Sequence, residues 1–450
     1  MYTRRNFIRT TIRVGAAASG SLALRPFGLL PALAQNGNNY RALVCVFLFG
    51  GNDANNMVIP MDSSFSAYSS IRGSLALAAT DLTAPTPSVS GPPVSFHGKL
   101  PDVASLYAGK ELAVVANVGP LVQPLTQSQY RNQQANIPLN LFSHSDQQLA
   151  WQTSVAQGHS PTGWAGRVAD YLEQAGVNSS SFPPFFSMAG SVVEGTGAST
   201  QPVALSPGQS LQLAGFNNSA ASQARWNALN GLIAEGSGLT LVQAADDTLA
   251  HSISDAAALS SALAKSTPLK TQFPATGLGA QLQQVAEIIQ VQSYLGMTRQ
   301  IFFCSLGGFD THANELQTHD NLYPQLSAAL AAFYNATQEL GVAQNVTTFT
   351  ESDFSRTFQP ATTNGSDHAW GSHHLVMGGA VQGGSIYGSF PTFQLGGPDD
   401  TDVRGRWIPT ISIDQYGATL CSWFGIPASA LAAIFPNLAN FSTSNLGFLG

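Results

Sequence analysis

Four short stretches of the chain are almost continuously apolar and rich in β-branched and aromatic residues. They cover residues 40–51, 111–119, 300–308 and 345–352. This pattern is typical of strands that are buried on both faces of a parallel sheet. Each stretch ends in glycine or in small polar residues, so each expected strand leads into a loop.

Between the expected strands, apolar residues recur at intervals of three and four, which is the period of an amphipathic helix. Such segments occupy residues 100–110, 162–176 and 322–341. Strands that alternate with helices predict an α/β fold, with a mostly parallel sheet and helices on both faces. Residues from about 222 to 298 are helical in pattern almost throughout, and we expect them to form a helical insertion.

The first residues of the chain predict export. Residues 3–9, Thr-Arg-Arg-Asn-Phe-Ile-Arg, form a twin-arginine motif, and the apolar residues 14–24 that follow are too few to span a bilayer. Residues 32–34, Ala-Leu-Ala, are typical of a signal-peptidase site. We therefore expect residues 1–34 to be a twin-arginine signal peptide, read by the twin-arginine export machinery and cleaved near Ala34, with an ordinary amphipathic helix as the alternative. Export by this route predicts a periplasmic or secreted protein that folds, often with its cofactor, before it leaves the cytoplasm.

The remaining residues, 35–450, are expected to form a single α/β domain, because no charged or Pro-rich linker divides them. Once residues 1–34 are removed, 13 basic residues remain against 25 acidic ones, a formal charge of −12. Such a surface repels nucleic acid and anionic membranes. No later apolar run is long enough to serve as a membrane anchor, so neither nucleic acid nor a membrane is an expected partner.

The three cysteines, Cys45, Cys304 and Cys421, lie far apart and are each flanked by apolar residues. This spacing fits neither a disulfide framework nor a zinc knuckle. We expect buried thiols that pack as small hydrophobic groups, with pairing of two of them as the alternative.

Side chains that could bind a metal follow three of the expected strands. The candidates are Asp53, Asp310, His312, Asp353, Asp367 and His368. Because the carboxyl ends of parallel strands meet at one edge of a sheet, these residues are expected to converge there. Carboxylates that converge repel each other unless a metal ion or an arginine lies between them. Mixed aspartate and histidine ligation suits zinc, manganese or iron, although any one of these motifs alone is equally typical of a turn.

Residues 363–374, Thr-Asn-Gly-Ser-Asp-His-Ala-Trp-Gly-Ser-His-His, hold three of the nine histidines of the chain. Within this segment Asp367 and His368 are the expected members of the metal site. His373 and His374 are expected either to orient the ligands or to be solvated.

Two further residues are candidates for catalysis. Ser143 lies where a loop enters an expected helix, and a hydroxyl at a helix N-terminus gains from the helix dipole when it loses its proton. The alternatives are the neighbouring Ser145 as the nucleophile, or a simple N-cap. Arg356 could bind an anionic substrate through two parallel hydrogen bonds, and an arginine in a structural ion pair is the alternative.

Four motifs occur in one order along the chain. They are FLFGGNDANNMVIP, SHSDQQLAWQ, SLGGFDTHANE and TESDFSRTFQPATTNGSDHAWGSHHLVMGGAVQGGSIYG. Together they resemble the bacterial exported family of domain of unknown function 1501 (DUF1501), over essentially all of residues 35–450. That family is considered distantly similar to the alkaline phosphatase and sulfatase superfamily, whose members use two metal ions and a hydroxyl nucleophile to hydrolyse phosphate or sulfate esters. The resemblance therefore implies an alkaline-phosphatase-like fold.

The resemblance also assigns roles by position. Asp53 is similar to the superfamily's first metal-binding aspartate, and Ser143 occupies the position of the nucleophile. Asp310 and His312 resemble the later metal-binding pair, with a tighter spacing than usual, and Asp353 resembles the aspartate of a Ser-Asp-His motif. Phe354 departs from that motif, because it stands where a histidine ligand is expected. The pair Asp367 and His368 could replace that ligand.

These observations predict an exported, metal-dependent hydrolase of phosphate or sulfate esters. It would hold one or two divalent ions of zinc, manganese or iron and act on a small anionic ester. The alternative is a non-catalytic secreted binding or assembly protein that retains the same fold, which the phenylalanine at position 354 favours.

Overall fold

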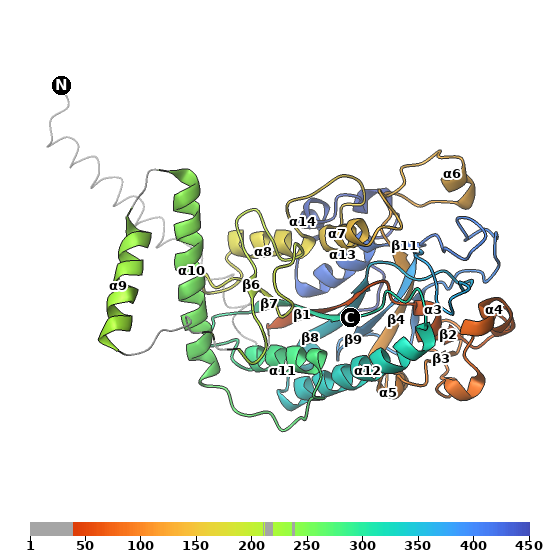
Figure 1. Cartoon of the computed structure of the whole chain (residues 1–450), viewed down its shortest axis with the longest axis horizontal. Coiled ribbons are helices and arrows are strands. Elements are labelled where there is room, and N and C mark those ends of the chain that lie inside the picture. The colour runs from red at the N-terminus through yellow and green to blue at the C-terminus, as the bar shows by residue number, and fades with distance from the viewer. Residues whose placement is uncertain (1–38, 210, 212–218, 236–238) are drawn as a thin grey trace, which may run out of the picture. The chain divides into compact units, whose positions relative to one another are not determined.

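All four continuous apolar stretches form strands of one sheet in the computed structural model, which describes residues 39–209, 211, 219–235 and 239–450 (Figure 1). They are β1 (Arg41–Phe49), β4 (Leu112–Gly119), β7 (Arg299–Gly307) and β8 (Val346–Ser352). Side chains on both faces of β1 are buried, as the pattern predicted. The expected signal peptide, residues 1–34, lies outside the described residues.

Within the described residues, the sheet contains nine strands in the order β10-β4-β9-β8-β1-β7-β5-β6, and β11 also pairs with β4. The shorter strands are β5 (Phe185–Ser187), β6 (Val203–Ala204), β9 (Ser372–Met377), β10 (Ile386–Gly388) and β11 (Ile411–Ser412). β1 runs parallel to both β7 and β8, whereas β9 runs antiparallel to β8 and β4. The prediction of a mostly parallel α/β sheet is confirmed.

Helices cover both faces of this sheet (Figure 1). One face carries α7 (His144–Thr153), α8 (Trp164–Gln174), α13 (Ile413–Phe424) and α14 (Ala428–Ile434). The other carries α5 (Pro101–Ala108), α11 (Gly277–Gln290) and α12 (Glu315–Glu339). The three helices predicted from the apolar period are confirmed as α5, α8 and α12. The predicted start of α12 lies too late in the chain, because its first turns are polar and the apolar period begins only after residue 321.

The helical segment from about 222 to 298 contains α9 (Ala220–Ala234), α10 (Thr240–Leu263) and α11. α11 packs against β7 and α12 and so belongs to the helical layer of the sheet. Most side chains of α9 and α10 are exposed, although Leu259 and Ala262 at the end of α10 are buried. The part that projects from the sheet as an insertion is therefore α9 and α10.

Smaller elements complete the fold. A two-stranded antiparallel sheet joins β2 (Val58–Pro60) and β3 (Val94–Phe96). The short helices are α3 (Ala54–Met57), α4 (Phe65–Arg72), α6 (Gln127–Arg131), η1 (Gly73–Leu75), η2 (Ala79–Asp81), η3 (Ala343–Asn345) and η4 (Leu438–Asn440). None of the helices in the described ranges is both long and apolar enough to cross a bilayer.

The cysteines behave as their flanking residues predicted. Cys45, Cys304 and Cys421 are free thiols with no exposed surface. Burial raises the pKa of each thiol, because a thiolate is poorly solvated inside an apolar core. The expectation of buried, unpaired cysteines is confirmed.

Candidate functional site

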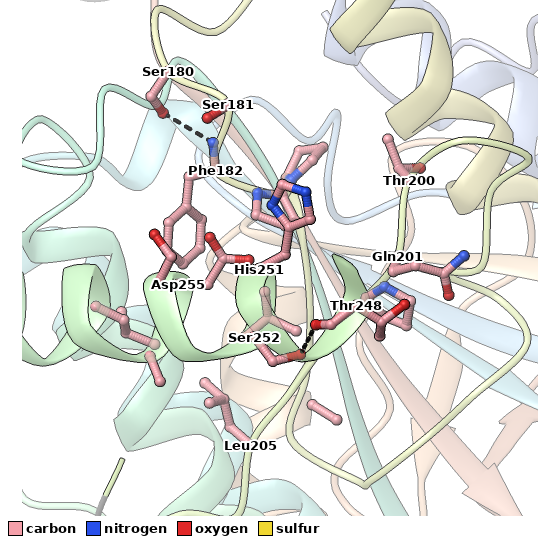
Figure 2. Close-up of a pocket in the computed structure, with 18 of the residues that line it drawn as sticks. Ser180, Ser181, Phe182, Thr200, Gln201, Leu205, Thr248, His251, Ser252 and Asp255 are labelled. Carbon is pink, nitrogen blue, oxygen red and sulfur yellow. Dashed lines mark hydrogen bonds between the residues drawn. The ribbon is translucent and has the colours of Figure 1, made fainter. Parts of the chain in front are cut away.

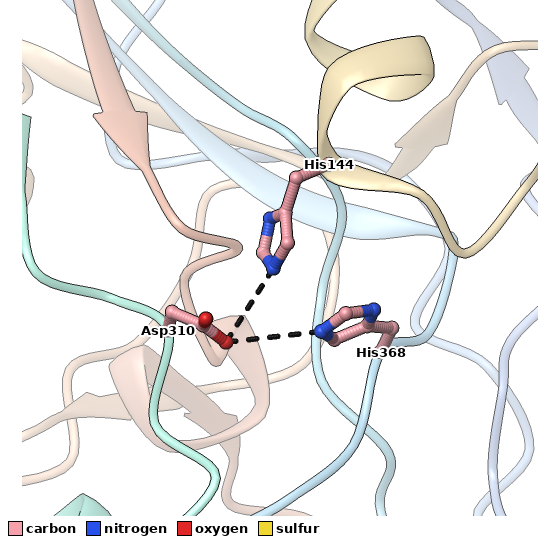
Figure 3. Close-up of side chains that lie close together, drawn as sticks. All are labelled: His144, Asp310 and His368. Carbon is pink, nitrogen blue, oxygen red and sulfur yellow. Dashed lines mark ion pairs between the residues drawn. The ribbon is translucent and has the colours of Figure 1, made fainter.

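Three histidines and one aspartate converge at the carboxyl edge of the sheet, and we call them the histidine–aspartate cluster: His144, Asp310, His312 and His368. Asp310 lies in the loop after β7, His144 is the first residue of α7, and His368 lies between β8 and β9. The Nε2 atoms of the three rings lie 3.4, 3.1 and 3.7 Å from Oδ1 of Asp310, for His144, His312 and His368 respectively. Figure 3 shows the rings of His144 and His368 pointing at this carboxylate.

The opposite nitrogen of each ring is held by an oxygen atom. Nδ1 of His144 lies 2.7 Å from Oδ2 of Asp353, and Nδ1 of His368 lies 2.6 Å from the carbonyl oxygen of Phe142. Nδ1 of His312 lies 3.4 Å from Oδ1 of Asp367. Because carbonyl and carboxylate oxygens accept hydrogen bonds, the contacts of His144 and His368 favour a proton on Nδ1 and leave Nε2 available to bind an ion. The Nε2 atoms of all three rings face Asp310.

The spacing of these donor atoms matches a metal site. Tetrahedral zinc with bonds of about 2.0–2.2 Å separates two ligand atoms by roughly 3.3–3.6 Å, and the three nitrogen-to-oxygen distances of 3.1 to 3.7 Å bracket that value. The Nε2 atoms of His312 and His368 are 2.9 Å apart. Nε2 of His144 is buried and has no hydrogen-bond partner, so it is free to bind an ion.

Two predicted residues, Asp353 and Asp367, lie beside the histidine–aspartate cluster and are not part of it. Asp353 is fully buried, and its carboxylate accepts from Gln148 Nε2 at 2.8 Å and from the backbone amide of Gly50 at 3.1 Å. Asp367 contacts His312 and forms an ion pair with Arg404 at 2.5 Å. These two aspartates orient histidine rings, which is how outer carboxylates support metal ligands in proteins.

Glycine is required where the loop after β1 meets the loop after β7. Gly50 has a φ of +110°, and a Cβ atom at this position would lie 2.4 Å from the backbone nitrogen of Asp310. The Gly-Gly turn that follows β1 therefore lets the two loops approach closely. This approach places Asp310 where the three histidines can reach it.

Arg356 holds these loops together from within. Its guanidinium is fully buried and donates to Oδ1 of Asp310 at 2.6 Å and to four backbone carbonyls, those of Gly50, Gly51, Phe309 and Ser366. These bonds engage all three of its nitrogens. The guanidinium has no exposed surface and pairs with Asp310, which favours the alternative of an ion-pair arginine over the expected role in binding an anionic substrate.

The protonation equilibria of the cluster follow from these contacts. The hydrogen bond to Asp353 raises the pKa of His144. Partial burial lowers the pKa of His368, because the imidazolium loses solvation there. For Asp310, burial acts to raise the pKa, but the hydrogen bond and charge of Arg356 outweigh it and lower the pKa.

Asp53 lies in a separate place, which we call the arginine cluster: Asp53, Arg72 and Glu315. All three side chains are fully buried. The guanidinium of Arg72 bonds to Oδ2 of Asp53 and lies 3.2 Å from Oε1 of Glu315. Of the two cations that converging carboxylates can recruit, a metal or an arginine, the structure supplies an arginine at Asp53. Arg72 ends α4, and sequence analysis did not single it out.

Ser143 is the N-cap residue of α7, but its side chain makes no capping bond. Its hydroxyl donates to Oδ2 of Asp146 at 2.6 Å and lies 3.2 Å from the hydroxyl of Ser145. The next residue, His144, is the one that reaches Asp310 and Asp353. His144 was not among the predicted site residues, and its place inside the motif SHSDQQLAWQ was the available signal.

The remaining histidines of residues 363–374 belong to the core. His373 and His374 lie on β9 and are buried, so the expectation that they are solvated is wrong. Nδ1 of His373 accepts from the backbone amide of Asn117 at 3.0 Å. Phe354 is also buried, and its ring lies 4.8 Å from the rings of both His144 and His368. It forms an apolar wall behind these two ligands.

A cavity of the described residues lies elsewhere. It has a volume of about 960 Å³ and is lined by the segments that surround β6 and by α10 (Figure 2). His251, Ser252 and Asp255 of α10 border it, together with Phe182 and Thr200. None of its lining residues belongs to the histidine–aspartate cluster.

Among solved structures, the chain is similar to proteins that share little of its sequence. One is the protein titled Ps i-CgsB, with 8% identity, a TM-score of 0.37, and coverage of 90% of this chain and 75% of the other. Another is a sulfatase of Bacteroides thetaiotaomicron from work on glycosaminoglycan metabolism, with 12% identity, a TM-score of 0.33, and coverage of 87% and 74%. A third is the phosphonate monoester hydrolase of Agrobacterium radiobacter, with 9% identity, a TM-score of 0.31, and coverage of 86% and 74%.

No protein of curated function matches the chain in sequence. A family model does match, over residues 40–402, and its description is protein of unknown function (DUF1501). This range contains every residue of the histidine–aspartate cluster and of the arginine cluster. The resemblance read from the four motifs is thereby confirmed: the chain belongs to the DUF1501 family.

Proposed function

We propose that this protein is an exported, metal-dependent hydrolase of phosphate or sulfate esters, with one divalent ion bound by the histidine–aspartate cluster. The observation that carries the proposal is the orientation of the three histidines. Two of them have Nδ1 hydrogen-bonded to an oxygen acceptor, and the Nε2 atoms of all three lie within 3.7 Å of Oδ1 of Asp310. Zinc, manganese and iron fit this donor set.

Electrostatics supports a cation at this place. The Nε2 atoms of His312 and His368 lie 2.9 Å apart, and the carboxylate of Asp310 places a negative charge beside them. Arg356 reaches Asp310 from the protein interior but does not lie among the rings. A divalent ion among the four donor atoms would bind the carboxylate and replace the contact between the two rings with bonds to the ion.

The exposure of the cluster favours a catalytic rather than a structural ion. The side chains of Asp310 and His312 are 51% and 47% exposed, whereas His144 and His368 are 27% and 22% exposed. An ion bound to these four donor atoms would have one side open to solvent, where it could take an exchangeable fifth ligand. When bound, the ion would polarise an ester oxygen and lower the pKa of a water molecule.

The surroundings of the cluster favour an anionic substrate. α7 begins at His144, so the positive end of a ten-residue helix lies beside the donor atoms. Arg404 lies next to the site through its ion pair with Asp367 and is 32% exposed. Both features attract a small anionic ester locally, even though the chain as a whole is acidic.

A single ion suits the geometry better than two. Asp53, which resembles a ligand of the superfamily's two-metal centre, is neutralised by Arg72 instead. Phe354 fills the space behind His144 and His368 with an apolar ring. The residues that remain at the strand ends form one donor set.

The chain's own residues would prepare the site before any substrate arrives. Asp353 and the carbonyl oxygen of Phe142 hold two rings in the required tautomer, and Asp367 holds the third. Arg356 fixes the backbone on either side of Asp310. Such preorganisation reduces the rearrangement that binding and catalysis would otherwise require.

Export through the twin-arginine machinery is part of the proposal and rests on residues 1–34. The protein would fold and take up its ion in the cytoplasm and act in the periplasm or outside the cell. Fractionation of cells that carry the native gene or an Arg4→Lys/Arg5→Lys variant tests this step. The account expects the variant to remain in the cytoplasm, and export of the variant would contradict it.

The test of function combines metal analysis with hydrolysis of p-nitrophenyl phosphate and p-nitrophenyl sulfate. Wild-type protein loaded with zinc, manganese or iron is expected to hydrolyse at least one ester. The variant His368→Ala is expected to lose both the ion and the activity, and the control His159→Ala is expected to keep both. A wild-type protein that binds the ion at the cluster but hydrolyses neither ester would support the non-catalytic binding protein instead.

A further inference from the structure

A second group of potential ligands is sealed inside the protein, and we call it the thiol–carboxyl cluster: Cys45, Glu194 and Glu351. Cys45 lies on β1, Glu351 lies on β8, and Glu194 belongs to the segment between β5 and β6. The thiol sulfur and one oxygen of each carboxyl group lie within 4.8 Å of one another. Cys45 and Glu194 have no exposed surface, and Glu351 is 3% exposed.

Cys45 and Glu351 hydrogen-bond to each other, but three of the four carboxyl oxygens of this cluster have no hydrogen-bond partner among the described residues. Neither oxygen of Glu194 has a hydrogen-bond partner in the described part of the chain, and Oε2 of Glu351 also has none. Buried carboxyl groups are almost always hydrogen-bonded or paired with a charge, because removing them from water is costly. Two such groups side by side in a core of aromatic and aliphatic residues therefore indicate a missing partner.

A shared proton does not account for the arrangement. Burial raises the pKa of Glu194 and of Glu351, and the charge of Glu351 raises the pKa of Glu194 further. A proton shared between them would require a hydrogen bond from one carboxyl group to the other. The oxygens of Glu194 make no such bond, although they lie close enough to Glu351 to bind a common ion.

We propose that the thiol–carboxyl cluster binds a second divalent cation, most suitably zinc, in a closed structural site. Zinc accepts thiolate and carboxylate ligands together, with bonds of about 2.3 Å to sulfur and about 2.0–2.2 Å to oxygen. A thiolate and two carboxylates carry three negative charges, which a divalent ion reduces to one. The ion would link β1, β8 and the segment after β5.

A buried histidine lies on the same side of the sheet. His374 lies on β9, which pairs with β8, and both of its ring nitrogens are buried without hydrogen-bond partners. The neighbouring amide of Leu375 donates to Oγ1 of Thr350, the residue before Glu351. His374 therefore stands across from Glu351, outside the group of three ligand atoms.

The two proposed sites differ in access, and this difference makes them separable. Asp310 is half exposed, so a chelator can reach an ion in the histidine–aspartate cluster. An ion at Cys45 would be enclosed by the core and would enter while the chain folds. Zinc analysis of the purified wild-type protein, before and after treatment with EDTA, is expected to fall from about two equivalents to about one.

Cobalt replaces zinc with a colour that reports its ligands. Protein produced with cobalt is expected to show a thiolate-to-cobalt charge-transfer band that survives EDTA treatment. The band is expected to disappear in Cys45→Ser and Glu194→Gln, and to remain in the control Cys421→Ser, which alters another buried thiol. The band should also remain in His368→Ala, because that change affects only the histidine–aspartate cluster. A failure of one proposal is therefore distinguishable from a failure of the other.

Wild-type protein alone can overturn the inference, even if the core variants do not fold. A folded wild-type protein that retains no metal after EDTA treatment, and that shows no thiolate-to-cobalt band, would exclude an ion at Cys45. A band that persists in Cys45→Ser would also exclude it.

Discussion

Two aspartates that follow neighbouring parallel strands are neutralised in different ways. Asp53, after β1, is fully buried and bonds to the guanidinium of Arg72. Asp310, after β7, is half exposed, pairs with Arg356 on its inner side, and faces the Nε2 atoms of three imidazole rings on the other. An arginine is a permanent cation supplied by the chain, whereas imidazoles leave a place for a cation from outside. The surrounding residues, rather than the position of an aspartate at a strand end, decide which becomes a metal ligand.

The largest expected effect is a loss of folding stability when Arg72, the cation of the arginine cluster, is removed. The variant Arg72→Met leaves the buried carboxyl groups of Asp53 and Glu315 without their cation, and breaking a buried ion pair in this way costs about 3–5 kcal/mol. Urea unfolding of wild type and variant measures the loss. The control Arg404→Met breaks an exposed ion pair and should cost about 1 kcal/mol or less. Equal losses in the two variants would contradict a structural role for Arg72.

Removal of a proposed ligand should affect metal binding rather than the fold. His144→Ala leaves two imidazoles and one carboxylate, and the affinity for zinc is expected to fall by more than about 100-fold, beyond the usual effect of an outer-sphere change. Competition with a chromophoric chelator measures this affinity. The matched variant Asp53→Asn should leave the zinc affinity within about threefold of wild type, provided that it folds. A large loss of zinc affinity in Asp53→Asn would show that the metal binds at the arginine cluster and not at the histidine–aspartate cluster.

Asp353 is expected to influence zinc affinity through His144, whose ring it orients. Asp353→Asn weakens the bond to Nδ1 of His144, and zinc affinity is expected to fall by about 10–100-fold with the ion still bound. The exposed carboxylate of Asp146 lies in the same helix and serves as a control, because its bonds go to Ser143 and Asn140. If Asp146→Asn weakened zinc binding as much as Asp353→Asn, the assignment of Asp353 would be incorrect.

A smaller effect is expected on the pH dependence of folding stability in the metal-free protein. The hydrogen bond to Asp353 raises the pKa of His144 above its unfolded value of about 6.5. Protonated His144 therefore stabilises the metal-free fold fully below that value, and this contribution is lost as the pH rises through the raised pKa. Urea midpoints measured from about pH 6 to pH 8 should show this loss relative to His144→Gln. Parallel curves for the two proteins would contradict the pairing.

The smallest effect is expected at Ser143. Its hydroxyl bonds to Asp146, so Ser143→Ala should change the zinc affinity and the rate of ester hydrolysis by no more than about threefold, within the range of one exposed hydrogen bond. Steady-state hydrolysis of p-nitrophenyl phosphate is the measurement. A loss of more than about 100-fold would instead identify Ser143 as a nucleophile, as its position in the motif suggested.

Much of the fold could be predicted because its strands carry a strong local signal. β1, β4, β7 and β8 are buried on both faces, and their apolar runs report that directly. β9 was missed because its polar start, Ser372 followed by His373 and His374, resembles a loop. The histidines are buried against aromatic rings such as that of Trp151, a contact that depends on tertiary packing.

The site could be predicted only in part, for a similar reason. Asp310, His312 and His368 could be predicted to lie close together because each follows a strand, and strand ends meet at one edge of the sheet. The same rule could not show that Arg72, nearly 20 residues beyond Asp53, returns to neutralise it. Nor could it show that α7 turns His144 rather than Ser143 toward the carboxylates, because one residue of helix rotates a side chain by about 100°.

The central claim is that the histidine–aspartate cluster, and not the arginine cluster, binds a divalent ion. The most direct measurement is an anomalous difference map from crystals of the zinc-loaded protein, recorded at the zinc edge. The account predicts a peak within about 2.2 Å of Oδ1 of Asp310 and of the Nε2 atoms of His144, His312 and His368. A map with no peak among these atoms, or with a peak between Asp53 and Glu315, would contradict it.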